Sequence, residues 1–241
     1  MALLPRAAAH VFVADPEAPV LAPDDRHHLT RVLRLRDGEA VTVADGRGRW
    51  RECVWRDGAL EAAGPLREDE AAGPPVTVAF GLTKGERPEW VVQKLTEVGV
   101  DTILPFRAAR SVVRWDEAKA AAAADRWRRV AREAAMQSRR ARLPYVAEVT
   151  DFAGAVSAVG TGGALAAPGG EPPDLVRPAL LVGPEGGWAP DELACGLPAV
   201  GLGPTVLRAE TAALAAAVVL CALRAGVVWP TRRSRDEGHK P

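Results

Sequence analysis

Short runs of alternating apolar and polar positions fill the first 72 residues, with the period of a half-buried β-strand. The runs at residues 10–13, 40–43 and 50–55 predict three strands. Asp-Gly pairs at residues 37–38, 45–46 and 57–58 have the backbone freedom that tight hairpin turns need. We therefore expect a small β-barrel or meander over residues 1–72.

After residue 75 the pattern changes to apolar strands that alternate with helices. Strands are predicted at residues 76–82, 102–106, 163–167, 179–182 and 199–202, and helices at 88–98, 115–137, 190–195 and 208–225. Such alternation is typical of an α/β domain with a parallel sheet, here over residues 76–230. We expect the acidic, proline-rich segment 68–75 to link the domains and residues 231–241 to form a flexible tail.

The composition narrows the class of protein. With 48% hydrophobic and 26% charged residues, the chain has the balance of a soluble globular protein. No apolar run reaches the roughly 18–20 residues of a membrane span, and residues 1–10 lack the apolar core of a secretory signal. The three cysteines, Cys53, Cys195 and Cys221, are odd in number and far apart, which favours a reducing compartment. We expect a cytoplasmic protein that does not contact a membrane.

The charges are balanced, with 31 basic and 31 acidic residues. This balance argues against a protein that holds nucleic acid by its overall charge, but it allows a local basic patch. One arginine-rich stretch covers residues 126–142, and another covers residues 26–36 of the first domain. Helical phasing would place His27, Arg31 and Arg34 on one face. Arginines at the end of a helix also stabilise its dipole, so the stretch at 126–142 has a structural interpretation as well.

Glycine and proline follow a buried strand at residues 182–187, where the sequence is VGPEGG. Ligands of open α/β sheets bind beyond the carboxyl ends of the strands, and glycines there let the backbone approach a ligand closely. An ordinary strand-to-helix turn is the alternative. The segment is not the Gly-x-Gly-x-x-Gly fingerprint of dinucleotide binding, and the chain has no Walker-type phosphate loop.

The same pattern, a predicted strand followed by Gly-Pro, occurs again at residues 200–213. Arg208, Glu210 and Thr211 then cluster at the start of the last predicted helix. Glu210 could serve only to cap that helix, since an acid in the first turn is favoured by the helix dipole. Residues 212–225 are apolar all round, which predicts burial in the core or against another subunit. The pair His27 and His28 has no further ligand at suitable spacing, so we expect no metal site.

Taken together, these segments resemble the RsmE family of bacterial ribosomal RNA uridine-N3 methyltransferases, in the SPOUT superfamily. Six motifs of the family occur in order and cover nearly the whole chain. They are HHLTRVLRLRDGE at 27–39, KGERPEWVVQKLTEVGVDTILP at 84–105, RSV at 110–112, EAAMQSRRARLP at 133–144, VGPEGGW at 182–188 and LGPTVLRAETA at 202–212. The chain departs from the family pattern at Thr205 and Ala209, where arginine and threonine are usual, and at Arg139, where glycine is common.

The resemblance implies a PUA-like β-barrel that helps to hold RNA, followed by a trefoil-knotted α/β domain that binds S-adenosylmethionine. It also implies a homodimer with active sites near the subunit interface, and small-subunit ribosomal RNA as partner. A noncatalytic ribosome-assembly factor on the same fold, or a SPOUT methyltransferase that acts on transfer RNA, are the alternatives.

The resemblance and the motifs assign three sets of site residues. The catalytic candidates are Arg208 and Glu210, because N3 of uridine carries a proton that must be accepted and a charge that must be stabilised. The cofactor-binding candidates are Val182, Gly183, Pro184, Gly186, Gly187, Leu202, Gly203, Val206, Leu207 and Thr211. The RNA-binding candidates are Arg31, Arg34, Arg36, Lys84, Arg110, Gln137, Arg140 and Arg142.

Overall fold

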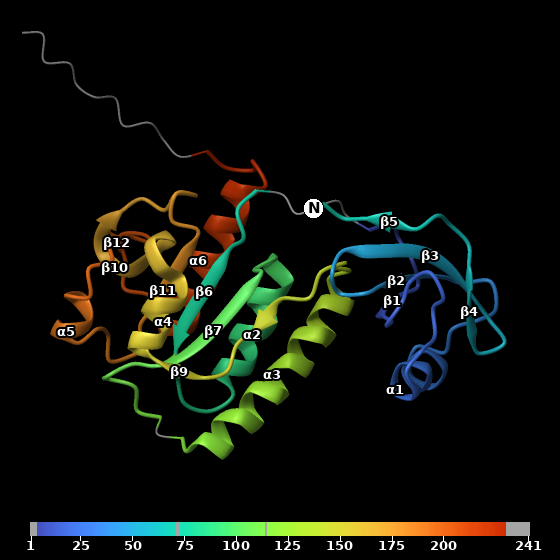
Figure 1. Cartoon of the computed structure of the whole chain (residues 1–241), viewed down its shortest axis with the longest axis horizontal. Coiled ribbons are helices and arrows are strands. Elements are labelled where there is room, and N and C mark those ends of the chain that lie inside the picture. Colours follow the sequence, from blue (N-terminus) through green and yellow to red (C-terminus); the bar gives the residue numbers. More distant parts are fainter. Residues whose placement is uncertain (1–3, 71–72, 114, 230–241) are drawn as a thin grey trace, which may run out of the picture.

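The computed structural model describes residues 4–70, 73–113 and 115–229, which form two domains joined side by side (Figure 1). The first domain is a five-stranded sheet. Its strands are β1 (Ala9–Phe12), β2 (Ala40–Ala44), β3 (Arg49–Arg56), β4 (Ala59–Ala62) and β5 (Arg67–Glu68). The order is β1-β2-β3-β4, with β5 also paired to β3, and every pairing except the parallel β1–β2 is antiparallel. All three predicted strands of this domain are present.

The segment between β1 and β2 is helical only as far as residue 32, which affects the face predicted for its basic residues. Helix α1 (Pro23–His27) continues into a π-helix (His28–Val32), and the regular structure ends there. Arg34 then has a left-handed backbone, with φ of 53°. The prediction that His27, Arg31 and Arg34 share one helical face is therefore wrong, because the turn at Arg34 breaks the helical periodicity.

The second domain is built on a seven-stranded sheet in which all pairings are parallel. Its strands are β6 (Thr77–Gly81), β7 (Thr102–Arg107), β8 (Tyr145–Val146), β9 (Thr150–Asp151), β10 (Gly163–Glu171), β11 (Ala179–Val182) and β12 (Ala199–Val200). The order is β12-β10-β11-β6-β7-β8, with β9 also paired to β7. The predicted α/β class is confirmed, and the trefoil knot stays a prediction.

Helices cover both faces of this sheet. On one face lie α2 (Arg87–Val98), α3 (Glu117–Gln137) and α6 (Ala209–Arg224), whose apolar side chains form the main core with β6, β7, β10 and β11. On the other lie α4 (Phe152–Val159), a 3-10 turn (Gly160–Gly162) and α5 (Pro190–Leu193), around a smaller core that includes Phe106 and Leu181. Helix α6 buries Ala213 and Leu220, but its Val218 is 46% exposed, so only part of this apolar helix is covered within one chain.

The two domains contact each other mainly through the end of α3, which reaches the strands of the first domain in Figure 1. Ala135 and Ala141 pack there with Phe12 and Trp50 in one apolar cluster. The segment predicted as a linker begins within β5, and its residues 71 and 72 lie outside the described residues. The predicted tail, residues 231–241, lies outside the described residues. Among the described helices, none has both the length and the apolar character that crossing a bilayer requires.

Candidate functional site

A cavity of about 420 Å³ lies at the carboxyl ends of β10 and β11 and along the segment that follows β12. Ligands bind at this edge of open α/β sheets, where the direction of the strand order reverses. Eight of the ten predicted cofactor-binding residues line it: Val182, Gly183, Pro184, Gly187, Leu202, Gly203, Val206 and Leu207. Gly186 and Thr211 do not. Sequence reasoning missed residues 166–168 of β10, Trp188 and Ala212, which also line the cavity.

Glycine is required at specific points of these loops. Gly187 and Gly203 have φ of 66° and 140°, which residues with a side chain rarely adopt. A Cβ atom on Gly81, at the end of β6, would lie 2.8 Å from Cδ of Pro184. The loop after β11 can therefore lie against β6 only because residue 81 has no side chain.

Gly186 contacts protein atoms outside the cavity. A Cβ atom there would lie 3.0 Å from Cβ of Arg110, and Arg110 Nη1 donates a hydrogen bond of 3.2 Å to the Gly186 carbonyl. The close approach that this glycine permits is to the loop after β7. The interpretation of Gly186 as a cofactor-facing residue is therefore revised: it holds the loop that lines the cavity against the loop after β7.

A second and larger cavity, about 1770 Å³, lies between α2, α3 and the start of α6. One face of each of the two helices lines it, and the first turn of α6 closes one end. Among the predicted residues, Lys84, Gln137, Arg208, Glu210 and Thr211 lie in this cavity. Arg208 also lines the smaller cavity, so the two spaces meet at its side chain.

Glu210 has an unusual environment at this junction. Its side chain is only 17% exposed, and Arg87 Nε lies 3.9 Å from Oε1. Arg87 also pairs with Glu185 of the loop after β11, at 2.5 Å. The other oxygen of Glu210, Oε2, is buried and has no hydrogen-bond partner among the residues that the structure describes. A buried acceptor without a partner is costly, and such atoms occur where a ligand completes the site. Sequence reasoning did not single out Arg87.

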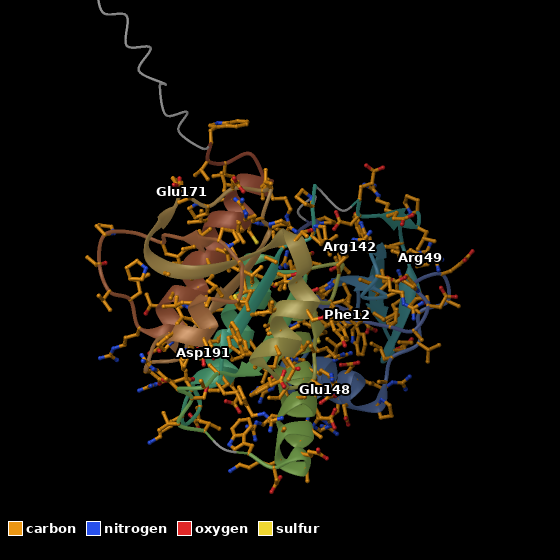
Figure 2. All side chains as sticks on the ribbon, turned by 60° about the vertical axis from the view of Figure 1, so that its left-hand side comes forward. Phe12, Arg49, Arg142, Glu148, Glu171 and Asp191 are labelled. Carbon is orange, nitrogen blue, oxygen red and sulfur yellow. The ribbon has the colours of Figure 1, made fainter. Side chains whose placement is uncertain are left out.

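Arg140 and Arg142 do not occupy positions from which they could bind RNA. Arg140 is 3% exposed, and its Nη1 donates to the carbonyls of Thr96 and Val100 at 2.8 and 2.9 Å. Arg142 donates to the carbonyls of Asp69 and Arg47 (Figure 2 labels it near the strands of the first domain). The prediction that they meet phosphates is therefore corrected. The Arg140 guanidinium ties the end of α3 to the end of α2, within the second domain. The Arg142 guanidinium ties the segment after α3 to the first domain.

The other arginines of the predicted RNA-binding set remain accessible. Arg31, Arg34 and Arg36 are exposed on the first domain, and Arg110 is exposed despite its bond to Gly186. Arg139 takes a left-handed backbone, with φ of 55°. That conformation explains physically why a glycine suits this position better. Within the part of the chain that the structure describes, no group of three or more potential metal ligands occurs.

Two family models match the chain. An RNA methyltransferase domain matches residues 70–221, and an RNA methyltransferase PUA domain matches residues 21–54. Ribosomal RNA small subunit methyltransferase E of Mycobacterium tuberculosis is 40% identical over 218 residues, which cover 82% of this chain and 83% of that protein. The chain belongs to the ribosomal RNA small subunit methyltransferase E family.

Another curated relative and two solved structures are also similar to this chain. The Bacillus subtilis protein of the same name is 31% identical over 230 residues, with 82% of this chain and 88% of that protein covered. The structure of the Neisseria gonorrhoeae enzyme bound to S-adenosylmethionine superimposes with a TM-score of 0.75 at 25% identity, over 89% of this chain and 97% of that one. A putative methyltransferase from Legionella pneumophila in complex with the same cofactor gives 0.76 at 27% identity, over 90% and 98%.

Proposed function

We propose that this protein transfers a methyl group from S-adenosylmethionine to N3 of a uridine in small-subunit ribosomal RNA. Membership of the RsmE family supports the reaction class and the kind of RNA. The observation that carries the proposal is Glu210 Oε2, a buried carboxylate oxygen without a hydrogen-bond partner among the described residues. It lies at the start of α6, two positions from Arg208, which borders both cavities.

The smaller cavity fits the cofactor. Its volume of about 420 Å³ lies within the range of roughly 300–1,000 Å³ that is usual for small-molecule sites. Apolar side chains such as Leu202, Val206 and Leu207 offer surfaces for a flat ring, and the glycine-rich segments expose backbone groups for polar contacts. When bound there, S-adenosylmethionine supplies a methyl group on a positively charged sulfur.

The larger cavity would hold the substrate. N3 of uridine keeps its lone pair unavailable while it carries a proton, so a base must accept that proton as the N3–methyl bond forms. We assign this role to Glu210, whose unpartnered Oε2 supports the assignment. Arg208 would stabilise the negative charge that develops on the uracil. Holding both reactants at a junction of two cavities supplies the alignment that a displacement reaction needs.

We infer that the protein works as a homodimer in the cytoplasm. The outer side of α6 and the segment that follows leave Val218, Val227, Val228 and Trp229 exposed, by 42–80%. Exposed apolar side chains gathered on one helix and the segment after it are typical of an interface. Light scattering should give twice the mass of one chain, and a monomer at micromolar concentration would contradict the dimer.

The function is tested by mass mapping of RNA after incubation with S-adenosylmethionine. We expect one methylated uridine in small-subunit ribosomal RNA, and a stop in primer extension there, because a methyl group on N3 blocks base pairing. Free RNA and assembled small subunits should be compared. Methylation of transfer RNA would favour the SPOUT alternative, and RNA binding without any methyl transfer would favour an assembly factor.

A further inference from the structure

Trp90 is exposed in a part of α2 where the helical pattern calls for polar side chains. Its neighbours Val91 and Val92 are 3% and 0% exposed, but Trp90 is 40% exposed and lines the larger cavity. The residues one or two turns away on the same face, at 86, 93, 94 and 97, are all polar and line the same cavity. The core does not account for an indole at this position.

The side chains around Trp90 have the chemistry that an unpaired nucleotide needs. Gln93 and Gln137 offer amide groups for base edges, and Lys84 and Arg208 offer positive charge for phosphates. Within the described chain, neither cation forms an ion pair, whereas Glu97 and Glu89 are neutralised by Lys94 and Arg126. Two further acids of the cavity, Glu86 and Glu133, are exposed to solvent.

The cavity also continues towards the first domain. Glu133 and Gln137, on α3, line both this cavity and a third one of about 800 Å³ between the domains. That third cavity includes Arg129, which is exposed and, among the described residues, has no hydrogen-bond or ion-pair partner. A strand of RNA could therefore contact the first domain and the Glu210 junction at the same time.

We propose that Trp90 is a stacking platform for one base of an unpaired RNA segment in the larger cavity. Unpaired bases are recognised by stacking on aromatic rings, combined with hydrogen bonds to their edges, whereas a duplex keeps its bases covered. The proposal rests on the proposed function for the identity of the ligand as RNA. It adds Trp90, which lies in the motif at 84–105 but was not among the site candidates, to the RNA-binding residues.

The test measures binding of a short oligouridylate to the full-length protein and its Trp90→Leu, Trp90→Phe and Trp90→Ala variants. Loss of stacking on one base should weaken binding about 5- to 150-fold in the leucine and alanine variants. Trp90→Phe should restore most of the affinity because it keeps an aromatic face. Leucine keeps the apolar contact without that face, so wild-type affinity in Trp90→Leu would overturn the proposal.

Three controls separate the possible causes. Tyr145→Ala removes another exposed aromatic side chain, 64% exposed on β8, and should leave binding unchanged. A hairpin stem should bind the wild type and Trp90→Leu equally, since its bases are already stacked. Calorimetry with S-adenosylmethionine should give wild-type affinity in Trp90→Leu, which shows that the fold is intact.

The readouts also distinguish this proposal from the proposed function. If oligouridylate binding depends on Trp90 but no uridine is methylated, the stacking proposal is supported and the proposed reaction is refuted. If Trp90→Leu methylates RNA at the wild-type rate at low RNA concentration, the stacking proposal is refuted and the proposed reaction is supported. If light scattering shows that Trp90→Leu changes the oligomeric state, Trp90 belongs to a subunit interface and the proposal is overturned.

Discussion

Glu192 Oε1 accepts a hydrogen bond of 2.8 Å from the backbone N–H of Ala109, although 83 positions separate the two residues. Its Oε2 accepts another from the N–H of Ala189, also at 2.8 Å. The side chain is 5% exposed. One buried carboxylate therefore fixes the loop that carries Arg110 to the end of the loop that lines the smaller cavity. Glu192 was not among the sequence candidates, because it has the appearance of an ordinary first-turn acid.

Glu192→Ala should destabilise the protein and loosen both loops. The substitution removes two partly buried hydrogen bonds to a charged acceptor, so the free energy of unfolding in urea should fall by roughly 1–3 kcal/mol in total. Affinity for S-adenosylmethionine should fall as well, because the loop at 183–189 loses its attachment. Glu192→Gln keeps one acceptor and should lie between the alanine variant and the wild type. Equal cofactor affinity in all three would show that the attachment does not shape the cavity.

Glu210→Gln should lower the methylation rate far more than it lowers binding. The amide keeps the size of the side chain but cannot accept the proton, and loss of a general base typically costs about 10²–10⁴-fold in rate. Single-turnover methyl transfer at saturating RNA and cofactor, measured against pH, gives the rate. If Glu210 only caps α6, the variant should lose less than ~1 kcal/mol of stability and retain its activity. A wild-type rate would transfer the base role to solvent or another residue.

Gly203→Val should weaken S-adenosylmethionine binding sharply while the protein stays folded. The φ of 140° at this position is adopted almost only by glycine, and the residue lines the smaller cavity. Gly38→Val is the matched control: Gly38 has φ of 91° in a turn of the first domain, and a Cβ atom on either glycine would meet nothing within 4 Å. Both variants should lose stability, but only Gly203→Val should lose cofactor affinity in calorimetry.

The salt dependence of RNA binding should depend on Arg129 and not on Arg140. A phosphate contact to a single strand contributes about 0.7 to the slope of log affinity against log salt. We expect Arg129→Ala to lower the slope by about that amount. Arg140 is buried, and burial lowers the pKa of its guanidinium below the usual value. Arg140→Ala should reduce the free energy of unfolding by about 1.5–3 kcal/mol, the usual worth of hydrogen bonds from a charged group. A reduced slope in Arg140→Ala would return it to the RNA-binding set.

His10 should make the stability of the protein depend on pH between about 4 and 6.5. The ring is 4% exposed, its Nε2 donates to the Arg140 carbonyl at 3.0 Å, and Nδ1 accepts from the Thr42 hydroxyl at 2.9 Å. Burial, partly offset by interactions with the backbone of Arg140 and Thr42, lowers the pKa of His10 from 6.5 to about 4. Only the unfolded state binds the proton in this range, so stability is complete above pH 6.5 and falls as the pH falls towards 4.

Protonation of His10 in the unfolded state should lower the free energy of unfolding by about 3 kcal/mol at pH 4, because each unit of pKa difference corresponds to about 1.4 kcal/mol. Urea unfolding of the wild type and of His10→Asn across this range isolates the contribution of the ring. The difference between the two proteins should be constant above pH 6.5 and shrink below it. A difference that does not change with pH would mean that His10 is not held neutral by burial.

The sequence by itself determined most of the elements and most of the smaller cavity. Strand β11 has the predicted bounds, because a buried strand followed by glycine and proline is a local signal. Eight cofactor candidates line one cavity because they follow parallel strands, whose carboxyl ends meet at one edge. The short strands β8 and β9 and helix α4 were missed, since two-residue strands have no period and α4 is apolar on most sides.

Only the tertiary structure decided what the charged side chains do. Arg140 and Arg142 follow a basic helix end and have the composition of a phosphate-binding patch. The end of α2 supplies the carbonyl partners of Arg140, and the first domain supplies a carbonyl partner of Arg142. Gly186 and Arg110 are 76 positions apart and meet only when two loops converge. The unpartnered oxygen of Glu210 and the exposed indole of Trp90 are likewise properties of how α2, α3 and α6 pack. Local patterns encode the period of each element, whereas the partner of a charge depends on contacts between residues far apart in the chain.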